Sequence, residues 1–166
     1  MEASIMEVVE KSTLQKKHKF QPISGAPYID LNIDDQKKMK QKVCLEVFEK
    51  IGKLKRPANY IEKWISSPNT YHYRNKMEYS FSSIKFDLNL NEVVDDSFAL
   101  GFKKKGTWWI VENLDKDSGL FDKQLENNLY LIRNFLKKIG LPAWHPPRKV
   151  GFFRHLVVRK SFESDK

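Results

Sequence analysis

Apolar residues recur at helical spacing in two segments of the chain. The first, residues 32–54, reads "NIDDQKKMKQKVCLEVFEKIGKL" and carries apolar side chains four residues apart, at Met39, Val43, Val47 and Ile51. This spacing predicts an amphipathic helix. Asp34 is placed to cap the start of the helix, and Gly52 is placed to end it.

The second helical segment covers residues 120–140, "LFDKQLENNLYLIRNFLKKIG". Gly140 and Pro142 stop it, because glycine favours the end of a helix and proline cannot continue one. Its apolar residues fall on one helical face: Leu125, Leu129, Ile132, Phe135, Leu136 and Ile139.

Alternation along the chain from Tyr73 to Phe86 predicts a long strand. One face of it carries Arg74, Lys76 and Glu78, and the other, apolar face carries Tyr73, Met77, Tyr79 and Phe81. Further strands are predicted at Phe98–Lys103 and Thr107–Glu112, and another centred on Val157. The segment "LNLNEVVDDS", residues 88–97, is interpreted as a hairpin loop. The order helix, strands, helix, strand favours an α+β fold, an antiparallel sheet with helices packed on one face and the other face free for a partner.

The charge of the chain favours a polyanionic partner. Lysine and arginine number 30 against 21 acidic residues, which gives a net charge of +9. A basic surface attracts polyanions through counterion release when its charges share one face. The chain has one cysteine, no recognisable signal peptide and no apolar run of membrane length, so we expect a cytoplasmic protein with no disulfide and no membrane contact.

Cationic side chains are concentrated in three of the predicted strands and turns. In each case the alternative is an ordinary solvated surface, and for Arg154 the possible partners are solvent, a phosphate or a carboxylate such as Glu78. One of Trp108 and Trp109 should face the core by alternation, and the other could stack on an unpaired base. The candidate RNA-binding residues are Arg74, Lys76, Lys103, Lys104, Lys105, Arg154, His155 and Arg159.

The residues by themselves do not support catalysis. No glycine-rich cofactor loop and no Ser-His-Asp pattern is visible, and His155 has no adjacent nucleophile. The four histidines show no metal-ligand spacing, and a single thiolate, Cys44, cannot assemble a cysteine-based metal site. We therefore expect no bound metal.

Three motifs in this order, "YRNKMEYSF", "LGFKKKGTWWIVEN" and "RHLVVRK", resemble the central region of the S-adenosylmethionine-dependent RNA uracil-5-methyltransferases. These enzymes make 5-methyluridine in ribosomal RNA and in the T loop of transfer RNA. The resemblance implies that residues 1–14 end a small β-barrel (TRAM) domain or its linker. It makes residues 15–33 a connector and residues 34–166 the central α+β RNA-recognition domain.

Many members of that family hold a four-iron cluster through four cysteines. The matching positions are close to Lys17, Ile23, Ala26 and Ser118, so the resemblance implies no iron–sulfur cluster here. The family's S-adenosylmethionine site, cysteine nucleophile and general base match positions beyond Lys166, and Cys44 does not match the nucleophile. We therefore expect this chain to be inactive by itself and to have no cofactor site.

What the resemblance implies for this chain is RNA recognition. A monomer would grip structured ribosomal or transfer RNA and present a flipped uridine to a catalytic domain. Two alternatives stay open at this point. The chain could be a free-standing RNA-binding module or a partner subunit completed by a separate catalytic chain, or it could be a gene fragment whose charged faces are merely solvated.

Overall fold

The computed structural model describes residues 19–95 and 97–161. They form two compact units, one made of residues 28–68 and the other of residues 19–27 together with 69–161. The predicted end of a β-barrel domain, residues 1–14, lies outside the described residues. The helix expected within the central domain belongs to the first unit, whereas the sheet belongs to the second.

The first unit contains helix α1, Ile33–Lys50, and the short 3-10 helix η1, Pro57–Tyr60. Asn32 caps α1, since its side-chain oxygen accepts a 2.9 Å hydrogen bond from the Asp35 N–H. The predicted cap at Asp34 is wrong because the helix already begins at Ile33. Val43 and Val47 on the predicted apolar face are about half exposed, and Ile51 is 77% exposed.

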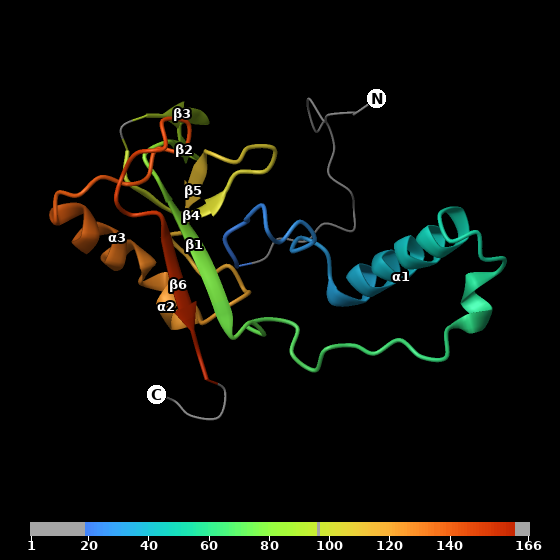
Figure 1. Cartoon of the computed structure of the whole chain (residues 1–166). Coiled ribbons are helices and arrows are strands. Elements are labelled where there is room, and N and C mark those ends of the chain that lie inside the picture. Colours follow the sequence, from blue (N-terminus) through green and yellow to red (C-terminus); the bar gives the residue numbers. More distant parts are fainter. Residues whose placement is uncertain (1–18, 96, 162–166) are drawn as a thin grey trace. The chain divides into compact units, whose positions relative to one another are not determined.

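The second unit is built on a six-stranded sheet with the strand order β3-β2-β5-β4-β1-β6 (Figure 1). The α+β class is confirmed, and every strand pair is antiparallel except β2 with β5, which is parallel. The predicted antiparallel sheet is therefore present, with one parallel pair within it. The strands are β1, Lys76–Ser82; β2, Lys85–Asp87; β3, Glu92–Val94; β4, Ala99–Lys103; β5, Val111–Asn113; and β6, His155–Arg159.

A break at residues 83–84 divides the single strand predicted for Tyr73–Phe86 into β1 and β2. The buried Ser82 hydroxyl donates to the Trp109 carbonyl at 2.9 Å and accepts from the Ile84 N–H at 3.0 Å, so the chain turns out of β1 there. Beyond the break, β2 pairs with β3, inside the segment predicted as a loop. The strand predicted from Thr107 begins only at Val111.

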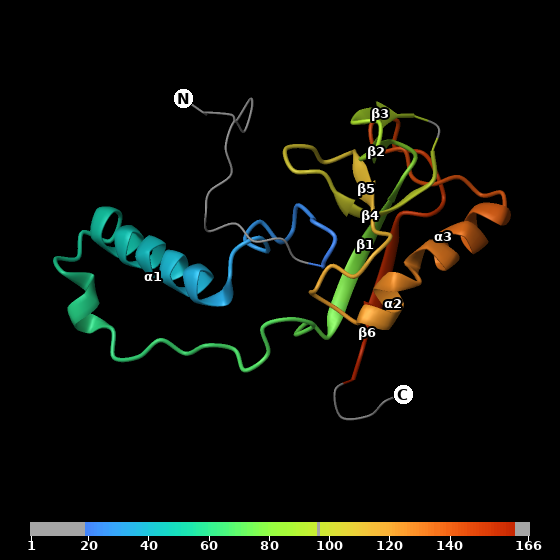
Figure 2. The same ribbon diagram turned by 180° about the vertical axis from the view of Figure 1, so that it is seen from behind.

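The second predicted helix is divided at Asn128 into α2, Lys123–Asn127, and α3, Leu129–Lys138. Both helices lie along the same side of β1 and β6, as Figures 1 and 2 show from opposite directions. The buried core between sheet and helices includes Met77, Tyr79, Phe81, Leu100 and Leu129. Because side chains alternate along a strand, Lys76, Glu78 and Ser80 lie on the face that these helices leave uncovered.

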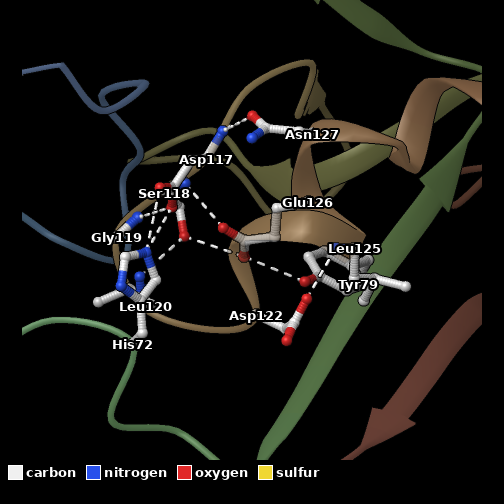
Figure 3. Close-up of polar contacts among 10 residues, drawn as sticks. All are labelled: His72, Tyr79, Asp117, Ser118, Gly119, Leu120, Asp122, Leu125, Glu126 and Asn127. Carbon is white, nitrogen blue, oxygen red and sulfur yellow. Dashed lines mark hydrogen bonds and ion pairs between the residues drawn. The ribbon is translucent and has the colours of Figure 1, made fainter.

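A buried carboxylate, Glu126 of α2, joins this helix to β1 and to the loop that precedes α2 (Figure 3). It accepts hydrogen bonds from the Tyr79 hydroxyl at 3.0 Å, the Ser118 N–H at 2.7 Å and the Ser118 hydroxyl at 3.0 Å. Burial, with the neighbouring Glu126 carboxyl, raises the pKa of the Tyr79 phenol far above its usual value. The three donors satisfy a polar group that would otherwise be costly to bury.

Candidate nucleic-acid interface

The uncovered face of the sheet carries a pair of cations on neighbouring strands. Lys76 of β1 lies directly opposite Arg159 of β6, and both side chains are exposed. Like charges placed opposite each other in a sheet repel, and an anion bound between them would reduce this repulsion. A surface hollow beside the pair is lined by Asn75, Lys76, Arg159, Lys160 and Ser161.

The three lysines of the turn, Lys103 to Lys105, lie in different surroundings. Lys103 ends β4 and is exposed on the side of the sheet that bears Ser80, as the register Ser80↔Gly101 and strand alternation require. Lys104 is directed to the other face. Its Nζ lies 3.9 Å from Glu112 Oε1 and 3.0 Å from the centroid of the Phe86 ring.

Lys105 is exposed in the turn, and its backbone N–H donates to the Ser24 hydroxyl at 2.7 Å. Glu112, the partner of Lys104, is mostly shielded from water. Burial raises the pKa of the Glu112 carboxyl, while the charge of Lys104 opposes the rise. The structure therefore leaves Lys103 and Lys105 open to a ligand and engages Lys104 within the protein.

Arg154 and His155 stand at the start of β6 with different partners. The Arg154 guanidinium lies 4.9 Å from the Trp144 ring centroid, a cation–π contact. His155 Nδ1 lies 3.2 Å from Glu78 Oε1, so the carboxylate considered for Arg154 faces His155 instead. Both side chains are exposed at the uncovered face of the sheet.

Arg74 does not continue the alternation of β1, because the strand begins only at Lys76. The Nη1 atom of Arg74 lies 3.9 Å from the sulfur of Met77, whose side chain enters the core. The backbone N–H of Arg74 donates to the Leu120 carbonyl at 3.1 Å. The structure thus brings Lys76, Lys103, Arg154, His155 and Arg159 to one face. The contacts of Arg74 are with Met77 and Leu120 instead.

A cavity on this face has three tryptophans in its lining. Trp108 and Trp109 come from the turn after β4, and Trp144 comes from the loop before β6. Neither Trp108 nor Trp109 enters the core, because the predicted strand alternation does not apply in the turn they occupy. Sequence reasoning missed Trp144, whose only signal was an aromatic residue within the proline-rich segment "PAWHPP".

Two of the three described positions that match the family's cluster ligands hold apolar side chains. Ile23 is buried in the core, and Ala26 packs against it. Ser118 is fully buried and donates its hydroxyl hydrogen to Glu126. Within residues 19–95 and 97–161, no group of three or more His, Cys, Asp or Glu side chains could hold a metal ion.

No helix among the described residues combines the length and the apolar character needed to cross a membrane. The second unit defines a class of protein domain: an α+β domain whose sheet has helices on one face and cations with aromatic rings on the other.

No protein-family model matches the chain. An uncharacterized RNA methyltransferase of Caldanaerobacter subterraneus is 32% identical over 163 residues, which covers 96% of this chain and 33% of the relative. The tRNA (uracil(54)-C(5))-methyltransferase of Pyrococcus abyssi is 22% identical over 141 residues, covering 85% of this chain and 29% of the relative. The chain is therefore homologous, along nearly all of its length, to one segment of the RNA methyltransferases.

The fold agrees with this relationship. The crystal structure of the Pyrococcus abyssi tRNA (uracil-54, C5)-methyltransferase, in complex with S-adenosyl-L-homocysteine, matches 96% of this chain with a TM-score of 0.63 and 19% identity. The match takes up 32% of that protein. The resemblance predicted from the sequence motifs is confirmed, and the chain spans about a third of the length of these relatives.

Proposed function

We propose that this chain is the RNA-recognition part of an RNA (uracil-5-)-methyltransferase that acts on ribosomal or transfer RNA. In this proposal the uncovered sheet face holds structured RNA and presents a flipped uridine to a catalytic domain. The single observation that carries it is the gathering of Lys76, Lys103, Arg154 and Arg159 on that face, in a homologue of RNA methyltransferases.

The cations are suited to phosphate contacts. The facing pair Lys76 and Arg159 could hold one phosphate, since two neighbouring donors share its negative charge. Lys103 and Arg154 extend the positive surface toward the tryptophan-lined cavity. Phosphate contacts of this kind fix the position of an RNA without reading its sequence.

In the proposed reaction S-adenosylmethionine, when bound, supplies the methyl group for uracil C5. The loop that leads into α2 does not suit that cofactor. Its N–H groups at Ser118, Gly119 and Leu120 already donate to the side chains of Glu126, Asp117 and Ser118. We therefore assign this chain the work of binding and orienting RNA, and we assign none of its described residues to the methyl donor.

We expect the 166-residue chain to bind structured RNA with an affinity that falls as salt rises. Each phosphate contact releases a counterion, so four contacts would give a slope of log affinity against log salt of roughly −3 to −4. Titration of a labelled stem-loop RNA at several salt concentrations measures this slope. Absence of binding even at low salt would contradict the proposed function.

We expect the chain to transfer no methyl group when it is mixed with S-adenosylmethionine and RNA. The reaction needs a thiolate that attacks uracil C6. The single thiol of the chain, Cys44, lies on α1 and does not match the nucleophile of the family. A labelled-cofactor assay, with the full-length Pyrococcus abyssi enzyme as positive control, measures methyl transfer. Turnover by the chain alone would show that it does more than recognise RNA.

A further inference from the structure

The cavity on the uncovered face is built by two loops that meet at one point of the sheet. The buried Ser82 hydroxyl donates to the Trp109 carbonyl at 2.9 Å, and the Ser83 N–H donates to the Trp144 carbonyl at 3.0 Å. Two adjacent residues at the end of β1 therefore hold both tryptophan-bearing loops. This arrangement fixes the backbones of Trp109 and Trp144 relative to each other.

Each loop is also closed on itself. The Lys104 N–H donates to the Ile110 carbonyl at 2.9 Å, which closes the turn that carries Trp108 and Trp109. The Trp144 N–H donates to the Phe153 carbonyl at 2.8 Å. At Gly151, whose φ is +128°, a Cβ would lie 2.4 Å from the Ala143 oxygen, so glycine permits the close approach that places Trp144.

The tryptophan rings leave flat surfaces open to a ligand. Trp108 is 56% exposed and stands edge-on to Trp109, with ring centroids 5.4 Å apart and planes at 77°. This T-shaped contact sets an edge of one indole against a face of the other, so it covers at most one of the two ring faces of Trp108. An exposed indole is costly to keep in water, and an unpaired nucleobase is a flat partner that would cover it.

The charges around the cavity decide between two kinds of aromatic ligand. A cage of aromatic rings can also bind a quaternary ammonium group. Here Lys103 and Arg154 line the same cavity, and the described residues that line it include no carboxylate. Two cations would repel an ammonium ligand and attract a phosphate, so the cavity suits a flat base attached to an anionic backbone.

We propose that this cavity is a subsite for one unpaired nucleotide of an RNA loop. The base stacks on the Trp108 indole, and Arg154, held over Trp144, and Lys103 contact the phosphate next to it. The proposal rests on the proposed function, since it assumes that RNA lies on this face. It adds that the face distinguishes unpaired loops from duplex, because the bases inside a duplex are stacked on their neighbours and have no free ring face to offer.

The test compares two RNAs and three substitutions in the 166-residue chain. The probes are a stem-loop and a blunt duplex of the same stem sequence, each fluorescently labelled. Trp108→Ala should weaken stem-loop binding about ten-fold and leave duplex binding unchanged, because base stacking is lost while phosphate contacts remain. Trp108→Phe should restore most of the stem-loop affinity. Trp64→Ala, an exposed tryptophan of the other unit, is the matched control and should change neither.

The outcomes separate this inference from the proposed function. If the unchanged chain binds both RNAs but Trp108→Ala behaves like Trp64→Ala, the nucleotide subsite is overturned and RNA recognition stands. An equal loss for stem-loop and duplex also overturns the subsite, since stacking was not the contact removed. If the unchanged chain binds neither RNA at low salt, both proposals fail together.

Discussion

A chain in which alanine replaces Glu126 is expected to lose about 3–5 kcal/mol of its free energy of unfolding. The substitution leaves the Tyr79 hydroxyl and both donors of Ser118 without their acceptor inside the protein. Each buried donor without a partner costs about 1–3 kcal/mol. Urea unfolding followed by circular dichroism measures the loss, with the exposed Glu62→Ala as the matched control. Equal midpoints for the two variants would contradict the role of this carboxylate.

The pH dependence of stability provides a second readout of Glu126. Burial raises the pKa of its carboxyl, and Asp117 adds to the rise, while hydrogen bonds from Ser118 and Tyr79 oppose it. Its contribution to stability is therefore fully present below a glutamate's ordinary pKa, about 4.3, and is lost as pH rises through the raised pKa. Since Glu126→Gln does not titrate, the stability of the unchanged chain relative to this variant should fall across that range. A constant difference would contradict the shift.

Reversal of three charges on the uncovered sheet face is expected to lower RNA affinity roughly 100-fold at low salt. The triple variant replaces Lys76, Lys103 and Arg159 by glutamate, which removes attraction to phosphate and adds repulsion. The slope of log affinity against log salt should become shallower by about two to three. Titration with the same labelled stem-loop RNA measures both effects.

A matched control for the triple variant is available on the opposite side of the sheet. Lys123 of α2 and Lys137 and Lys138 of α3 are exposed on the helices that cover the other face. Their replacement by glutamate changes the net charge by the same amount. If both triple variants lose affinity equally, the binding depends on total charge, and the uncovered face is not the interface.

Local patterns in the sequence predicted much of the fold. The alternation placed Met77, Tyr79 and Phe81 on one face, and that face is buried, because side-chain direction in a strand depends only on position along it. Tyr73, predicted for the same face, lies before the strand begins and is 47% exposed. The breaks were not predictable in this way. Ser82 interrupts the strand through the carbonyl of Trp109, 27 residues away, and no local pattern shows such a partner.

The candidate site was predicted in composition but not in arrangement. The basic residues were identified from the motifs, yet the turn separates Lys103 from Lys104, and Glu78 pairs with His155 instead of Arg154. Trp144 was missed because its loop is irregular and its place depends on hydrogen bonds to Ser83 and Phe153. Their RNA contacts stay predictions, to be tested by the variants above.

The sequence by itself determined the α+β class, the positive charge and the direction of each side chain within a regular strand, since these follow from composition and local periodicity. Only the tertiary structure decided which residues meet. Lys76 faces Arg159, and three tryptophans share one cavity, because strand register and loop closure join segments that are distant in the chain. Long-range pairing depends on the whole packed core, and this physical reason keeps it out of reach of any short sequence pattern.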